Sequence, residues 1–178
     1  ADIVNERSAN VRRDDPSYYG CLPQGRRANL YASEMEKFIQ TRGVLVVLTE
    51  DLTYRQIFLD GRELPADPDP SFMGHSVGHW DGDTLVVDVK GFTDGTWLSR
   101  AGDFHSDELH VVERYTPLNR QVIQYEATIE DPKTFTRAWK ISMPLYRHME
   151  KNAQLLEFKC VEFVEELMYG PLRKQTSK

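Results

Sequence analysis

Along most of the chain, apolar residues alternate with polar ones or gather in short runs, a pattern typical of β-strands. The clearest case is residues 74–92, where two strand-like segments flank the tripeptide Asp81-Gly82-Asp83. Asp-Gly between such segments is a strong hairpin signal, because glycine adopts a positive φ without steric cost. The sequence therefore predicts a β-hairpin here, with β-branched residues in its second arm.

The same pattern predicts further strands on both sides of the hairpin. They are expected at residues 38–41, 44–49, 54–60, 109–116, 122–129, 135–145 and 155–163. Residues 63–73 contain Pro65, Pro68 and Pro70, and this segment is predicted to be a loop because proline cannot donate a hydrogen bond to a central strand. A second irregular segment is expected at residues 97–107.

The predicted strands are short and follow one another at regular spacing, without helices between them. This arrangement predicts an all-β fold, an antiparallel meander β-barrel of the lipocalin or calycin kind with about eight or nine strands. The 178 residues are expected to form a single domain. Within it, residues 1–33 are predicted to be a polar N-terminal arm, residues 38–163 the barrel, and residues 165–174 a short terminal helix.

The charge pattern narrows the choice of partners. The formal net charge is −6, and lysines and arginines are interspersed with acidic residues, so neither nucleic acid nor an anionic membrane is expected as the main partner. No apolar run approaches the roughly 20 residues of a membrane-spanning helix, so no membrane insertion is expected. The chain begins at Ala1 without a methionine, and one interpretation is that a leader peptide has been removed.

Two cysteines, Cys21 and Cys160, lie far apart in the sequence. One interpretation is that both are buried free thiols. The other is a disulfide that ties the N-terminal arm to a late strand, which would require an oxidising compartment. No further cysteine lies near either one, so a cysteine-based zinc site is not expected.

Four segments together carry a resemblance. Residues 54–62 read YRQIFLDGR, residues 78–87 read GHWDGDTLVV, residues 109–115 read LHVVERY, and residues 131–133 read DPK. In this order they are similar to a family of secreted bacterial proteins, frequent in acidobacterial and proteobacterial genomes, with GHWxGDTLVV and LHVVER motifs. The similarity extends over about residues 20–170.

The resemblance implies a cellular location and a disulfide bond, but it implies no enzymatic activity. Members of that family carry an early cysteine and a late one before a glutamate, here Cys21 and Cys160 with Glu162. An extracytoplasmic location, periplasmic or secreted, and a Cys21–Cys160 disulfide are therefore implied. The chain departs from the family at Arg137-Ala138-Trp139, where many members read Arg-Pro-Trp, which weakens the prediction of that strand.

A small barrel either fills its interior with side chains or holds one ligand. The chain has 3 Trp, 8 Tyr and 8 Phe residues, which could serve either purpose. An aromatic-lined pocket with a few polar groups would suit a small apolar or aromatic molecule. The side chains expected to line it are Tyr54, His79, Trp80, Trp97, Tyr125 and Trp139.

Acid–base chemistry is one candidate activity. His105 lies in a predicted loop that enters a strand, and His110 follows within that strand, while Glu113 points to the opposite, apolar face. A buried carboxylate needs a cation or hydrogen bonds, and Arg55 is the natural match. Arg55 and Glu113 are interpreted either as a structural ion pair or as part of a catalytic site. In the catalytic hypothesis His105 and His110 carry protons, Glu113 or Asp60 is the carboxylate partner, and Arg55 stabilises an anion.

A metal site is the weaker candidate. His75 and His79 would share one strand face about 13 Å apart, too far to bind one ion without a bulge, and a third ligand such as His105 or His110 would be needed. The set His75, His79 and His105 is therefore kept only as an alternative, and no metal is expected. No phosphate-binding loop or dinucleotide fingerprint occurs, so no cofactor is expected.

Three functional hypotheses remain. The first is a cofactor-independent isomerase, lyase or hydrolase that uses histidine and carboxylate chemistry on a molecule bound in the barrel. The second is a non-catalytic, lipocalin-like protein that binds or carries such a molecule. The third is an accessory protein whose barrel is solid. The first requires at least two ionisable side chains to converge at one end of the pocket, whereas the second does not.

Overall fold

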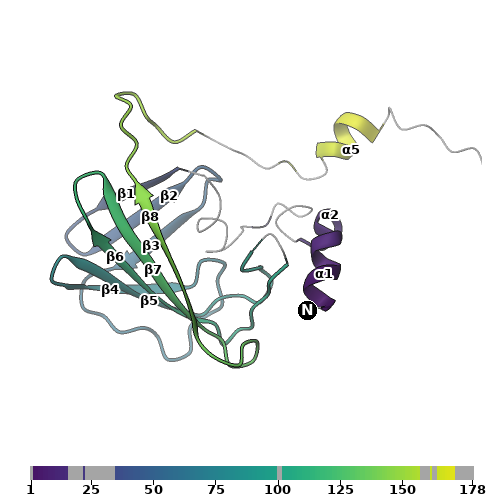
Figure 1. Cartoon of the computed structure of the whole chain (residues 1–178), viewed down its shortest axis with the longest axis horizontal. Helices are drawn as coiled ribbons and strands as arrows, with labels where there is room; N and C mark the ends of the chain where they lie inside the picture. Colours follow the sequence, from purple (N-terminus) through teal and green to yellow (C-terminus); the bar gives the residue numbers. More distant parts are fainter. Residues whose placement is uncertain are drawn as a thin grey trace, which may run out of the picture.

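A computed structural model of the protein describes residues 2–15, 22, 35–99, 102–156, 161 and 164–170. Eight strands form one curled sheet in sequential order, a half-barrel, with two short helices beside one of its ends (Figure 1). The strands are β1 Glu36–Gln40, β2 Val44–Thr49, β3 Tyr54–Phe58, β4 His75–Asp81, β5 Thr84–Lys90, β6 His110–Pro117, β7 Val122–Glu130 and β8 Trp139–Tyr146. The helices are α1 Asp2–Ala9, α2 Val11–Asp14 and α5 Val164–Tyr169.

The predicted all-β, barrel-like fold is confirmed, with two differences in how the strands pair. Neighbouring strands are antiparallel except for β3 and β4, which run parallel over Ile57↔Ser76 and Phe58↔Val77. The proline-containing connection at residues 59–74 carries the chain back before β4 begins, so that β4 starts in the direction of β3. Moreover, β1 and β8 are the two edges of the sheet, so the described strands form an open half-barrel rather than a closed barrel.

Several predicted elements are found where the pattern placed them. The hairpin consists of β4 and β5, and Gly82 in its turn has a φ of 61°. Strand β2 has the predicted bounds of residues 44–49, and residues 97–99 and 102–107 contain no regular strand, as expected. Short apolar runs predict β2 and β5 well because these strands are largely buried.

Other predicted elements differ from the structure. Within the predicted N-terminal arm, residues 2–9 and 11–14 form α1 and α2, for which the sequence pattern gave no signal. Strand β8 begins at Trp139 and not at residue 135, because residues 131–135 form a hydrogen-bonded turn that closes on Asp131. Residues 155, 156 and 161 are not in a strand, and the other residues of the predicted strand 155–163 lie outside the described residues.

The core lies on the concave face of the half-barrel. Antiparallel register places Val47 opposite Arg55, Val87 opposite Glu113 and Tyr115 opposite Tyr125, so these side chains share the inner face. Apolar residues from β2, β3, β5, β6 and β7 form one buried cluster there. Every helix in the described segments is too short or too polar to cross a membrane.

Candidate functional site

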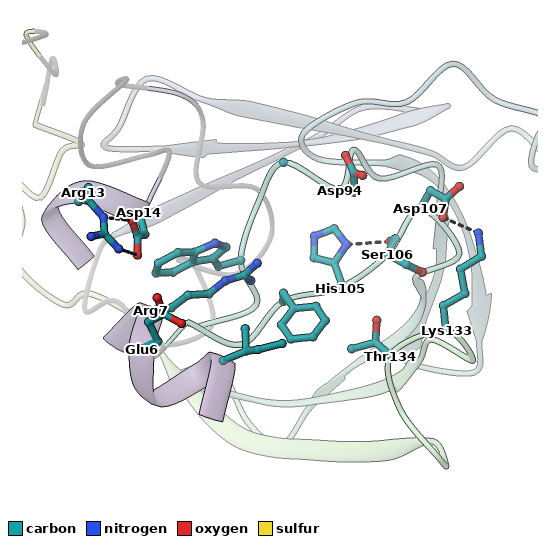
Figure 2. A pocket seen from close by; sticks show the side chains of 14 residues that line it. Glu6, Arg7, Arg13, Asp14, Asp94, His105, Ser106, Asp107, Lys133 and Thr134 are labelled. Carbon is teal, nitrogen blue, oxygen red and sulfur yellow. Dashed lines mark hydrogen bonds and ion pairs between the residues drawn. The ribbon is translucent and has the colours of Figure 1, made fainter. Parts of the chain in front are cut away.

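A pocket of about 810 Å³ lies where α1 and α2 approach the loops at one end of the half-barrel (Figure 2). Three segments that are distant in sequence build it: the N-terminal helices, the loop at residues 94–107 and the turn after β7. Its walls combine aromatic rings with charged and hydroxyl groups. The lining residues are Ile3, Glu6, Arg7, Arg13, Asp14, Asp94, Gly95, Trp97, Phe104, His105, Ser106, Asp107, Lys133 and Thr134.

Arg7 joins α1 to the aromatic wall of the pocket. Its Cζ lies 4.8 Å from the ring centroid of Phe104 and 5.7 Å from that of Trp97, within the range of cation–π contacts. Gly102 permits this approach, because a Cβ at its position would lie only 2.6 Å from Cβ of Arg7. Nη1 of Arg7 is buried and has no hydrogen-bond partner among the described residues.

The other cations of the pocket are paired with carboxylates. Arg13 lies 2.5 Å from Asp14, and this hydrogen bond holds the pKa of the Asp14 carboxyl below its ordinary value. Nζ of Lys133 lies 2.8 Å from Asp107 and 3.1 Å from Glu108. The hydrogen bond from Lys133 likewise lowers the pKa of Asp107. Among the described cations that line the pocket, only Arg7 has no ion-pair partner.

His105 is buried at the back of the pocket with both ring nitrogens engaged. Nδ1 lies 2.9 Å from the carbonyl oxygen of Ser106, so Nδ1 is the donor. Nε2 shares a hydrogen bond of 2.8 Å with the hydroxyl of Thr96. The ring also makes an edge contact with Phe92, with the centroids 6.0 Å apart. These contacts hold the imidazole in one orientation in the wall of the pocket.

Asp131 fastens the His105 loop to the turn after β7. The backbone N–H and the hydroxyl of Ser106 donate to its carboxylate over 2.6 and 2.7 Å, and the N–H groups of Lys133 and Thr134 donate over 3.2 Å. Burial by itself raises the pKa of Asp131, but the hydrogen bonds from Ser106 and Thr134 outweigh it and leave the pKa lowered. Two walls of the pocket are thereby held in one geometry.

The predicted pair of Arg55 and Glu113 is formed inside the half-barrel, away from this pocket. Nη2 of Arg55 lies 2.5 Å from Oε2 of Glu113, and both side chains are buried. Tyr125 donates its hydroxyl to Glu113 over 2.8 Å, and Nε of Arg55 donates to Ser76 over 2.9 Å. These side chains form a buried polar network on the inner face of four strands, in which Nη1 of Arg55 has no hydrogen-bond partner among the described residues.

The remaining acid–base candidates lie elsewhere. His110 is on the outer face of β6, where Nε2 lies 2.7 Å from Asp88 and Nδ1 lies 3.6 Å from Glu130. Asp60 is exposed and pairs with Arg62 over 2.6 Å. The structure therefore does not bring together the five residues of the catalytic hypothesis, except for Arg55 with Glu113.

Of the residues expected to line a ligand site, Trp97 lies in the pocket wall. Tyr125 is buried on the inner face of the half-barrel, and Trp139 is half-buried at its edge, 5.6 Å from the ring of Phe135. The other three are exposed on β3 and β4 and do not line the pocket: Tyr54, His79 and Trp80.

The alternative metal site is not assembled in the described part of the chain. No group of three or more His, Cys, Asp or Glu side chains there could hold a metal ion. Nε2 of His75 instead lies 2.7 Å from the carbonyl oxygen of Asp69. Cys21 and Cys160 lie outside the described residues, so the expected disulfide is untested.

Sequence reasoning identified two residues of this pocket, Trp97 and His105, and missed its cations. Arg7 and Arg13 lie in a polar segment without apolar periodicity, which gave no signal of a defined structure. Lys133 belongs to the segment Asp131-Pro132-Lys133. The sequence of this segment predicts a turn, but it gives no sign that Lys133 lines a pocket.

Comparison with known proteins gives no information on the family or the function of this chain. The chain matches no protein-family model, no curated protein and no solved structure. The resemblance to a secreted bacterial family therefore stays a prediction.

Proposed function

We propose that this protein binds a small organic molecule in the pocket between α1, α2 and the loops of the half-barrel. The observation that supports the proposal is a pocket of about 810 Å³ whose lining combines two aromatic rings with mostly charged and polar side chains. That volume lies within the range of small-molecule sites. Trp97 and Phe104 supply the apolar surface, while Glu6, Arg7 and Asp94 supply charged groups.

Binding without catalysis is the better supported hypothesis. Acid–base catalysis needs proton-active groups that can reach the ligand and that converge on it. In this pocket, both nitrogens of His105 are engaged by Thr96 and Ser106. Outside the pocket, His110 is hydrogen-bonded to Asp88, and Asp60 pairs with Arg62. The acid–base hypothesis therefore stays a prediction without a converging set of residues behind it.

Binding of N-phenyl-1-naphthylamine, a neutral aromatic probe that fluoresces in apolar sites, tests the proposal. Replacing Trp97 by Ala removes a large part of the aromatic wall, and the loss of such a contact, about 1.5–3 kcal/mol, should weaken binding roughly ten- to hundredfold. The matched control is Trp80→Ala, because Trp80 is 50% exposed and does not line the pocket.

A second variant separates loss of the pocket from loss of folding. Thr134→Trp places a large side chain in the pocket and should block the probe while the circular dichroism spectrum stays that of the unmodified protein. Absence of binding to the unmodified protein, or equal binding by all four proteins, would rule out this pocket as the binding site.

We further infer an extracytoplasmic, lipocalin-like binding protein with a Cys21–Cys160 disulfide. The support is the resemblance of its motifs to the secreted family together with the barrel-like sheet. Closing so long a loop would stabilise the protein by about 4–5 kcal/mol in the chain-entropy model. Titration of the unfolded, unreduced protein should find no free thiol, and two free thiols would disprove the cross-link.

A further inference from the structure

We propose that the pocket selects amphipathic organic anions, and that Arg7 recognises the anionic group. This inference rests on the proposed binding function and names its ligand class: an aromatic or apolar body that carries one carboxylate, sulfonate or similar group. Arg7 differs from the other two cations of the pocket in its lack of a carboxylate partner among the described residues.

Arg13 and Lys133 already have carboxylate partners within the protein, whereas Arg7 has none among the described residues. The guanidinium of Arg7 lies over the rings of Trp97 and Phe104, and among the described residues its buried Nη1 has no hydrogen-bond acceptor. A buried donor is normally satisfied, so an unsatisfied one in a pocket wall indicates that a partner is still to be bound. The missing partner is a hydrogen-bond acceptor, and beside a guanidinium a negatively charged acceptor binds most strongly.

The surroundings of Arg7 suit an anion that is attached to an apolar body. Figure 2 shows Arg7 extending from α1 into the pocket. Cation–π contacts with Trp97 and Phe104 restrict the guanidinium, so its planar fork is held in the pocket wall where it can donate to an oxyanion. The same two rings line the pocket, so the body of a ligand held by Arg7 lies against an aromatic surface.

The acidic residues of the pocket limit the charge of the ligand. Asp14 and Asp107 are neutralised by Arg13 and Lys133, but Glu6 and Asp94 also line the pocket and are exposed to water. Two exposed carboxylates and a net charge of −6 disfavour a polyanion such as a polyphosphate. A cationic ligand would meet these carboxylates in water, but it would leave the buried Nη1 of Arg7 unsatisfied.

Two fluorescent probes with the same aromatic skeleton test the anion preference. 8-Anilinonaphthalene-1-sulfonate carries a sulfonate, and N-phenyl-1-naphthylamine lacks it. The unmodified protein should bind the sulfonate probe about tenfold more tightly, as expected for one charge-assisted hydrogen-bonded contact. Arg7→Met, which keeps an apolar stem, should remove this preference, so that the two probes bind with similar affinities.

Arg7→Lys keeps the charge without the planar fork and should give an intermediate preference. The matched control is Arg62→Met: Arg62 is a surface cation outside the pocket that pairs with Asp60, so this variant should keep the preference of the unmodified protein. Should Arg7→Met fail to fold, the unmodified protein alone decides. 1-Naphthoate should then displace the bound probe at a concentration about tenfold lower than 1-naphthamide does.

The outcomes distinguish this inference from the proposed function. Binding of both probes with equal affinity, or a preference that survives Arg7→Met, would overturn anion recognition while small-molecule binding stands. Tighter binding of the cationic aromatic dye thioflavin T than of the sulfonate probe would also overturn it. Failure of every probe to bind would instead refute the proposed function itself.

Discussion

At the residue scale, the ion pair of Arg55 and Glu113 is a fully buried charge pair of the half-barrel. Both side chains are at most 2% exposed, so neither charge is compensated by water. Replacing Glu113 by Gln keeps its shape but leaves the guanidinium charge buried and unpaired. Removing one partner of a buried pair typically costs about 3–5 kcal/mol, and we expect that loss in the free energy of unfolding measured in urea.

Two further variants test whether charge compensation is the cause. The double variant Arg55→Met with Glu113→Leu removes both buried charges and should recover most of the lost stability. Asp60→Asn breaks the exposed pair with Arg62 and should change stability little, because water compensates the freed charge. A Glu113→Gln protein as stable as the unmodified one would contradict this account.

At the scale of elements, Asp131 connects the loop that carries His105 to the turn that precedes β8. Asp131→Asn should lower the free energy of unfolding by about 1–3 kcal/mol near neutral pH, because one strong charged acceptor is lost. The pKa of Asp131 is lowered in the folded protein, so the unfolded chain, with a pKa of about 3.9, binds the proton more readily. The contribution is therefore complete above about pH 4 and is lost as the pH falls through the folded-state pKa.

Urea unfolding of both proteins at neutral pH and at about pH 3 measures this dependence. The stability difference between the unmodified protein and Asp131→Asn should shrink at the lower pH. Asp67→Asn, in an exposed part of the proline-containing loop, is the control and should have little effect at either pH. A difference that does not change with pH would show that the carboxylate charge of Asp131 contributes nothing.

The strands were predictable because burial acts on one face at a time. In β7 the alternation along the sequence follows the alternation of burial, whereas β2 is a short apolar run in which every second residue is buried. In β6, Glu113 lies on the same face as Val111 and Tyr115, and this period of two is why it could be assigned to an apolar face and paired with Arg55. Helix α1, with the sequence DIVNERSA, buries no residue completely and has no apolar stripe. Its helical structure and its Arg7 were therefore not predictable from periodicity.

At the scale of the whole molecule, pairing between distant segments was not accessible from the sequence. The parallel start of β4 depends on the path of residues 59–74, and the open edges β1 and β8 depend on how far the sheet curls. The pocket likewise forms only where the N-terminal helices, the loop that carries His105 and the turn after β7 come together. Each of these segments alone is a polar loop or helix. Single residues such as His105 could be marked as candidates, but which of them share a site follows only from this assembly.

The assembly of the pocket depends on Gly102, where the loop meets α1. Its φ is +93°, and an added Cβ would lie 2.6 Å from Cβ of Arg7, so Gly102→Ala should strain the loop and push α1 outward. Gly82→Ala is the matched control, because Gly82 has a φ of +61° with nothing within 4 Å of the added Cβ. Both variants should lose about 1–2 kcal/mol of stability through backbone strain. Only Gly102→Ala should weaken binding of both naphthylamine probes, whereas equal affinities in the two variants would mean that α1 is not part of the binding site.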